Sequence, residues 1–275
     1  MSLKAFSWIL LSAIAIGSIL LFNYWASYQL LSTLAYAGIA AALGGLANAV
    51  IPFRFLGIRR RIVGVVILAG GVVLMVAALI WPAPMFRVGH PQTYLDDAMP
   101  EYQFWEKHSV RIHARPEQVM QAVRQSTFGD MKSLSMLLKI RSAGLRTPSE
   151  STGALAADRR ILDAFSASGY VSGGGEHEIV TCGGANVPAR RPLKPRSLEE
   201  CASYREPGAI KVAFNFTAGD AGQGWSVVST ETRVLATDDV TSRGMGRYWR
   251  LIVPGSGLLR RQWLAGIKRR AESEP

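Results

Sequence analysis

The distribution of charge along the chain constrains its fold more than any other feature. The chain has 275 residues, yet its first acidic residue is Asp96. Before Arg87 there are only five basic residues: Lys4, Arg54, Arg59, Arg60 and Arg61. A stretch so long and so poor in charge cannot form the surface of a water-soluble fold, because its apolar side chains need an apolar solvent. We therefore expect residues 1–82 to be a membrane anchor.

Three apolar segments in this anchor, 5–22, 30–51 and 62–81, are each long enough for a transmembrane helix. A helix needs about 20 residues to cross the hydrocarbon core. A cleaved signal peptide is the alternative for 5–22, since Lys4 precedes an apolar run. No small-x-small cleavage motif precedes Asn23, however, so we expect the segment to be retained. Aromatic residues collect near the segment ends, where rings favour the membrane interface: Trp8, Tyr24, Trp25, Tyr28 and Trp81.

Small residues in the second segment predict close packing against a neighbouring helix. We expect this packing to occur within one chain. The residues are Ala37, Ala41, Gly44, Gly45 and Ala49.

The loops between these segments predict the orientation. Four arginines lie in residues 53–61, whereas residues 23–29 carry no charge. Positively charged loops remain in the cytoplasm, so three crossings would place everything after Trp81 on the other side. For the inner membrane of a bacterium, this compartment is the periplasm or the cell exterior.

The chain has two cysteines, Cys182 and Cys201, both in the soluble part. A disulfide between them would close a loop of about 20 residues and contribute on the order of 3 kcal/mol. Such a bond persists only in an oxidising compartment, in agreement with the orientation. The alternative is two unrelated thiols.

After the anchor, residues 83–106 read as an irregular, proline-containing linker, and residues 107–275 as one soluble domain. Polar and apolar residues alternate over 108–113, which indicates a strand. A helix follows at Pro116, since proline suits a first helical turn. Two further short helices are expected at 130–140 and 158–166.

The second half of the soluble domain alternates as strands do. Strands are expected at 176–181, 209–217 and 225–236, the last two forming a hairpin across a glycine-rich turn. A long C-terminal helix should begin at Asp238 or Asp239, with a kink or interruption at Pro254. Its later part places apolar residues on one face and basic residues, including Arg260, largely opposite them.

This element order resembles the helix-grip, or START-like, fold of the SRPBCC superfamily, which includes polyketide cyclase-like proteins. The resemblance covers residues 101–272 and none of the anchor. It implies an α+β fold, with an antiparallel sheet wrapped on the long C-terminal helix and a cavity between them. The similar segments are Glu-Lys-His-Ser-Val-Arg-Ile-His-Ala-Arg-Pro-Glu-Gln-Val at 106–119, Val-Ala-Phe-Asn-Phe at 212–216, 229–238 and Arg-Tyr-Trp-Arg-Leu-Ile at 247–252.

Such a cavity would bind an apolar or amphipathic small molecule. Alternation along the strand and helical spacing select the side chains that should line it, or that simply fill the core. These candidates are Val212, Phe214, Phe216, Tyr248, Trp249 and Trp263.

Glu231 and Arg233 are two further candidates, because they point to the same face of one strand. Facing inward, they would be the polar contact of a ligand or a buried ion pair. Facing outward, they would form an exposed network with Lys211. The opposite face of that strand is more apolar, which favours the exposed alternative.

We predict no metal site, no cofactor and no catalytic residues. His108 and His113 fall on opposite faces of a strand, and His177 lacks the residue spacing of a zinc-binding helix. An enzyme of the cyclase or hydrolase type would need polar residues converging in the cavity. No nucleophile elbow or phosphate-binding loop is recognisable either.

The sequence thus predicts a membrane-tethered binding module for a hydrophobic or lipid-like small molecule. A non-catalytic assembly subunit of a membrane complex, with a filled core, is the alternative. Nucleic acid is not an expected partner of a domain outside the cytoplasm. The basic stretch 243–270 would instead face anionic lipid headgroups, or simply water.

Overall fold

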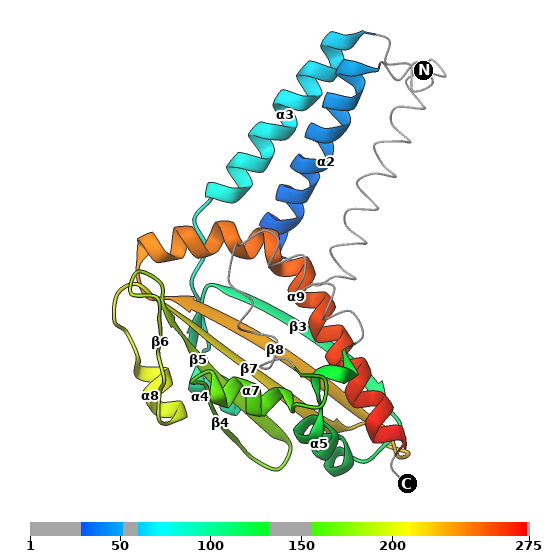
Figure 1. Cartoon of the computed structure of the whole chain (residues 1–275), viewed down its shortest axis with the longest axis vertical. Coiled ribbons are helices and arrows are strands. Elements are labelled where there is room, and N and C mark those ends of the chain that lie inside the picture. Colours follow the sequence, from blue (N-terminus) through cyan, green and yellow to red (C-terminus); the bar gives the residue numbers. More distant parts are fainter. Residues whose placement is uncertain (1–28, 52–59, 132–155, 274–275) are drawn as a thin grey trace. The chain divides into compact units, whose positions relative to one another are not determined.

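The computed structural model describes residues 29–51, 60–131 and 156–273 (Figure 1). The chain forms two compact units. The first comprises Met1–Pro82 together with Gly246–Pro254, and the second comprises Ala83–Met245 and Gly255–Pro275. The last helix, α9 (Asp239–Ser273), therefore contributes residues to both units.

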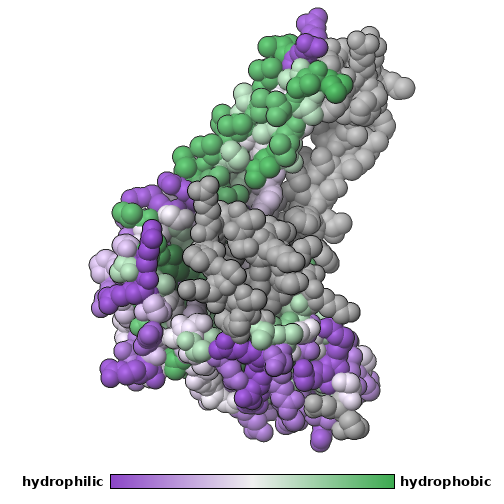
Figure 2. Space-filling view, viewed as in Figure 1, coloured by the Kyte–Doolittle hydropathy of each residue, from purple (hydrophilic) through white to green (hydrophobic). Residues whose placement is uncertain are grey.

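The first unit contains two apolar helices, α2 (Leu30–Val50) and α3 (Arg61–Ile80), each long enough to cross a membrane. Their bounds agree with the expected segments to within one residue. Only 28% of α2 and 17% of α3 are buried within the protein, and their outer surface is apolar (Figure 2). The expected first crossing, 5–22, and most of the arginine loop lie outside the described residues.

The two helices touch through their backbones at glycines. A Cβ on Gly38 would lie 2.8 Å from the carbonyl oxygen of Gly71, and one on Gly45 would lie 2.7 Å from that of Gly64. Only the absence of a side chain permits this approach, as is common between membrane helices. Gly44, one of the small residues expected to pack, has nothing within 4 Å.

Residues 246–254 of α9 pack against this helix pair. Arg250, only 2% exposed, donates hydrogen bonds to the carbonyl oxygens of Leu79 and Trp81, both at 2.6 Å. The Tyr36 hydroxyl donates to the carbonyl oxygen of Leu251 at 2.6 Å. The cation of Arg250 thus satisfies carbonyl groups that the end of α3 leaves without helical partners.

The second unit is an α+β domain around an antiparallel sheet in the order β3-β8-β7-β5-β4, with β6 paired to β5. A separate two-stranded sheet joins β1 and β2. The elements not yet bounded are β1 (Phe86–Arg87), α4 (Tyr94–Ala98), β2 (Glu101–Tyr102), β3 (Phe104–Ile112), α5 (Pro116–Gln125), the 3₁₀ turn η2 (Phe128–Asp130), α7 (Ile161–Ala167), β4 (Val171–Gly174), β5 (Glu178–Asn186), β6 (Arg191–Pro192), α8 (Leu198–Ser203), β7 (Ala209–Asp220) and β8 (Ser226–Ala236).

One face of the sheet packs against α5, α7 and the part of α9 that follows Gly255. α5 forms here because Pro116 fixes its first turn and its apolar residues fall on one side. The core on this face includes Val119, Met120, Val123, Ile161, Phe214, Phe216, Trp263, Leu264 and Ile267.

The other face has its own core, built with α4 and α8. Leu95 and Met99 are fully buried there, and a disulfide joins Cys182 of β5 to Cys201 of α8. Lys211 is buried on the same face, where its Nζ donates to the carbonyl oxygen of Ala202 at 2.8 Å. Burial lowers the pKa of Lys211 to about 8.

The expectation of an irregular linker at 83–106 is wrong. This stretch forms β1, α4 and β2, and Leu95 and Met99 anchor it in the second core. Thr93 is the N-cap of α4 and forms a capping box with Asp96. This pair of residues is a helix-start signal that the sequence already contains.

Two other expectations concern helices. The helix expected at 130–140 lies almost entirely outside the described residues. The long C-terminal helix begins at Asp239 as expected. Of the two alternatives expected at Pro254, an interruption is excluded, because α9 continues through it to Ser273. Gly257 lies directly over β3, since a Cβ there would be 3.3 Å from the ring of His108. We attribute the continuity to this packing, which offsets the hydrogen bond that proline removes.

The glycine contact of α2 and α3 predicts opposite effects for two neighbouring substitutions. Gly45→Ala should destabilise the full-length protein in detergent by about 2 kcal/mol, because overpacking forces the backbones apart. Gly44→Ala should be neutral or slightly stabilising, since alanine favours a helix and nothing lies within 4 Å of Gly44. Thermal unfolding of both variants measures the difference, and equal melting temperatures would contradict the close contact.

Candidate ligand-binding site

The sheet face that packs against α9 carries two rows of side chains across three strands. Residues paired in register share a face, because side chains alternate along each strand. Glu106 of β3, Thr232 of β8 and Phe214 of β7 form one row. His108, Thr230 and Phe216 form the next row. Each row therefore runs from polar residues on β3 and β8 to an aromatic ring on β7.

The aromatic end of the rows is tightly packed. The ring of Trp263 from α9 lies 4.6 Å from that of Phe216 and 5.9 Å from that of Phe214, between centroids. Phe165 of α7 lies 4.9 Å from Phe214. The Trp263 Nε1 donates to the Ser126 hydroxyl at 2.7 Å, which leaves its indole satisfied. Such ring pairs contribute about 0.5–1.5 kcal/mol each beyond burial, so these contacts stabilise the aromatic end.

The polar end contains a buried carboxylate. Glu106, 1% exposed, accepts a hydrogen bond from the Ser256 hydroxyl of α9 at 2.5 Å. Its other oxygen lies 3.4 Å from Nε2 of His108, which is 6% exposed. The serine and the histidine thus both contact the carboxylate, and these contacts do not supply the serine with a histidine base. This arrangement orients polar groups and does not resemble an activated nucleophile.

Three buried polar atoms between these two ends have no hydrogen-bond partner within the part of the chain that the structure describes. They are the hydroxyl oxygens of Thr230 and Thr232 and the Nη1 of Arg260. The guanidinium of Arg260 lies 4.3 Å over the ring of Phe214, whose cross-strand neighbour is Thr232. Leaving a buried polar group unpaired costs about 1–3 kcal/mol, so these atoms mark a place where a partner would stabilise the fold.

Tyr170 lies beside this group. Its ring covers Gly183, where a Cβ would come within 2.5 Å of the ring, and it contacts Phe165 at 5.2 Å between centroids. Burial raises the pKa of Tyr170, and the positive charge of Arg260 opposes that rise. Burial lowers the pKa of Arg260, against the opposing charge of Glu106. Both residues are half-buried, and the charge of each influences the pKa of the other.

The aromatic candidates from the sequence separate into three groups. Phe214, Phe216 and Trp263 lie together in the core, with Val212 half-buried on the same face. Tyr248 is 44% exposed, so its expected inward position is wrong. Trp249 is buried, but it belongs to the stretch of α9 that packs with α2 and α3.

Glu231 and Arg233 lie on the opposite face from Phe214, since Glu231 pairs in register with Asn215. The favoured expectation of an exposed pair is wrong: the Arg233 side chain is 8% exposed. It donates to Glu231 at 2.7 Å and bridges to Asp96 at 2.8 Å. Arg233 also donates a hydrogen bond to the carbonyl oxygen of Met99 at 3.2 Å. Arg233 therefore holds the α4 segment against the sheet.

The residues that sequence analysis missed are Glu106, Thr230, Thr232, Ser256 and Arg260. Phe104, Glu106 and His108 are every second residue of β3, so all three face inward. A charged residue at such an inward position was the signal available in the sequence. Arg260 was expected on the polar face of the C-terminal helix. It lies over Phe214 because it is three residues, about one turn, before Trp263.

Neither the family models nor the curated proteins nor the solved structures with which the chain was compared give a match.

The unpaired hydroxyls predict an unusual stability effect. Thr232→Val should stabilise the ligand-free, full-length protein by about 1 kcal/mol, because it removes a buried polar atom without a partner and keeps the side-chain shape. The matched control is Ser226→Ala in the same strand. Its hydroxyl donates to the carbonyl oxygen of Ala114 at 2.6 Å, so its loss should destabilise. A destabilised Thr232→Val variant would show that the hydroxyl is satisfied.

Proposed function

We propose that this protein is a membrane-tethered binding module for a hydrophobic or lipid-like small molecule, held between the sheet and α9. The observation that carries the proposal is the set of unpaired buried atoms on Thr230, Thr232 and Arg260 beside the ring of Phe214. Binding sites for small molecules combine such an apolar wall with a few convergent polar groups.

The chemistry of these atoms indicates the polar end of the ligand. The guanidinium is only a donor, whereas each threonine hydroxyl can donate or accept. Their common complement is an oxygen acceptor, such as a carbonyl, ester or carboxylate oxygen. The apolar part of the molecule would then lie along the aromatic side chains.

The topology supports a helix-grip, START-like assignment. The first long strand, β3, pairs with the last strand, β8, and α9 follows directly. The other long strands, β7 and β5, follow β8 in the sheet as antiparallel neighbours, and α5 and α7 come after β3 in the chain. This is the order that the resemblance implies for residues 101–272.

For localisation, we propose a multi-pass protein of a bacterial inner membrane, with the soluble unit on the periplasmic or extracytoplasmic side. α2 and α3 provide two crossings, and the segment 5–22 would provide the third. The arginines before α3 favour the cytoplasm for that loop. A disulfide between Cys182 and Cys201 suits an oxidising compartment.

A non-catalytic assembly subunit of a membrane complex is the second candidate. It is favoured by one observation: the rings of Phe214, Phe216 and Trp263 already contact one another. In that case the core is filled by the protein's own side chains, and the interior would take up no small molecule.

The binding proposal is tested with a dansyl-labelled undecanoate titrated into the full-length protein in nanodiscs, with empty nanodiscs as the background. Arg260→Met should weaken binding at least tenfold, since a charge-assisted hydrogen bond contributes about 1.5–3 kcal/mol. Arg243→Met, an exposed arginine on the same helix, is the matched control and should bind like the wild type.

Thr232→Val separates binding from folding, because it should bind more weakly although its ligand-free form is more stable. A wild-type protein that takes up no probe and carries no extracted amphiphile would refute the binding proposal and favour the filled core.

The topology is tested by fusing alkaline phosphatase, which is active only outside the cytoplasm, after Pro275. We expect an active fusion. Replacing Arg59, Arg60 and Arg61 together by glutamine should reduce that activity, because these charges favour the cytoplasm for their loop. An inactive fusion of correctly inserted protein would place the soluble unit in the cytoplasm.

A further inference from the structure

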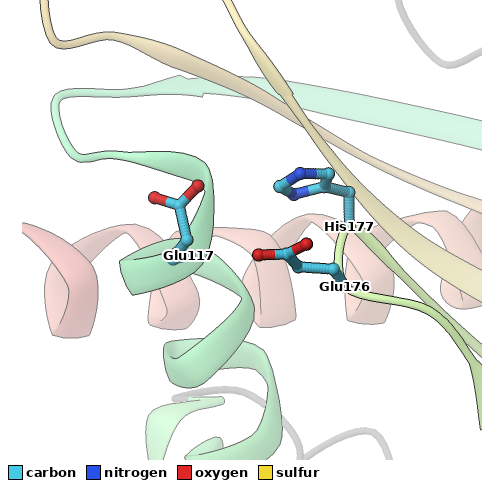
Figure 3. A group of neighbouring side chains, drawn as sticks. All are labelled: Glu117, Glu176 and His177. Carbon is cyan, nitrogen blue, oxygen red and sulfur yellow. The ribbon is translucent and has the colours of Figure 1, made fainter.

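Three side chains with metal-binding atoms meet on the surface of the second unit, away from the site proposed above. Glu117 lies in the first turn of α5, and Glu176 and His177 lie in the turn between β4 and β5. One ligand atom from each residue lies within 4.8 Å of the other two. Figure 3 shows the carboxylate of Glu176 and the ring of His177 extending from the turn toward Glu117.

The backbone that carries these side chains is held firmly on both sides. The carbonyl oxygen of His177 accepts from the backbone N–H of Ala218 at 3.0 Å, and that of Glu178 accepts from Gly175 at 2.9 Å. The neighbouring Gly174 has φ +132, which a residue with a side chain rarely adopts. Glu178 itself accepts from the N–H of Tyr94 at 2.9 Å. These hydrogen bonds therefore fix the backbone from which the side chains of Glu176 and His177 extend.

Glu117 is equally well placed. Val119 and Met120, which follow it in α5, are buried in the core and fix the start of the helix. A negative side chain is favoured in the first turn of a helix. The side chain of Glu117 is thus presented to the turn by an element that the rest of the fold holds in place.

The residue types point to a divalent transition metal. Zinc accepts imidazole nitrogen and carboxylate oxygen as ligands, and three protein ligands leave a fourth position for water or another molecule. In a tetrahedral zinc site, bond lengths of about 2.0–2.2 Å place ligand atoms roughly 3.4 Å apart. The present spacing needs only small side-chain rotations, which all three exposed residues can make.

The charges near this cluster are unbalanced. Within the described ranges, none of the ion pairs includes Glu117 or Glu176. Two carboxylates at this distance repel each other, by about 1 kcal/mol in water. A divalent cation between them would replace this repulsion by attraction.

The cluster also borders an open groove. Glu176 and His177 form part of the wall of a groove of about 600 Å³, together with Thr217, Ser229 and Val227 of the β7–β8 hairpin. With three protein ligands, a metal at the cluster would keep an open coordination position. A second molecule could therefore reach the metal.

We propose that Glu117, Glu176 and His177 form a binding site for Zn²⁺ at the edge of this groove. The site is independent of the ligand-binding proposal, because its residues lie outside the face between the sheet and α9. All three ligands are exposed, so the fold does not depend on the ion.

The test is isothermal titration of ZnCl₂ into the full-length protein in detergent, freed of metal with a chelator and carrying no histidine tag. We expect one ion per chain. His177→Ala and Glu117→Gln should each weaken binding at least tenfold, while His90→Ala, an exposed histidine outside the cluster, should bind like the wild type.

Mg²⁺ should not compete at equal concentration, because the imidazole selects zinc. Binding below half an ion per chain, or an unchanged affinity in His177→Ala, would overturn the proposal. So would equal binding of Mg²⁺, which would reveal an acidic surface without metal selectivity. Thermal unfolding of each variant without metal should match the wild type, so loss of the fold is separated from loss of the site.

Discussion

The pairing of β3 with β8 is the contact on which the second unit depends. It joins Phe104–Ile112 to Ser226–Val234 over nine consecutive residue pairs, between segments more than 110 residues apart in the chain. This register places Glu106 beside Thr232 and His108 beside Thr230. Because α9 follows β8 directly in the chain, this pairing also fixes where α9 begins. The polar half of the candidate site therefore exists only once these two strands have met.

Each face of the sheet holds an arginine, but the two side chains have different partners. Arg233 is surrounded by Glu231, Asp96 and the carbonyl of Met99, so its charge is fully paired. Arg260, on the α9 side, lies over an aromatic ring, and one of its nitrogens has no partner in the described chain. Burial without pairing is costly, and proteins keep it mainly where function uses it. This contrast is why the functional proposal rests on Arg260 and not on Arg233.

Sequence periodicity predicted most of the elements and less of the site. The start of β7, the bounds of β8 to within one residue and the start of α9 follow from alternation and a capping aspartate, whereas β7 runs three residues beyond its expected end. The apolar helices α2 and α3 follow from the length of their apolar segments. The expected exposure of Glu231 and Arg233 failed because α4 covers the face on which they lie. Alternation cannot show that a short helix from a proline-rich stretch buries a strand.

The cluster of Glu117, Glu176 and His177 could not be predicted from the sequence, for a different reason. Glu117 and His177 are 60 positions apart, and only the packing of α5 beside the β4–β5 turn brings them together. No local spacing rule can join residues from two elements that meet through the core. The aromatic core, in contrast, could be predicted, because Phe214 and Phe216 mark an inward face by themselves.

The division of α9 between two units has a consequence for biosynthesis. Residues 246–254 complete the helical unit, but they are made only after the whole sheet has been synthesised. Arg250, which donates to the carbonyl groups at the end of α3, is therefore synthesised roughly 170 residues after them. Until then the carbonyl groups of Leu79 and Trp81 need other hydrogen-bond donors, such as water. The helical unit is thus begun before the sheet and completed after it.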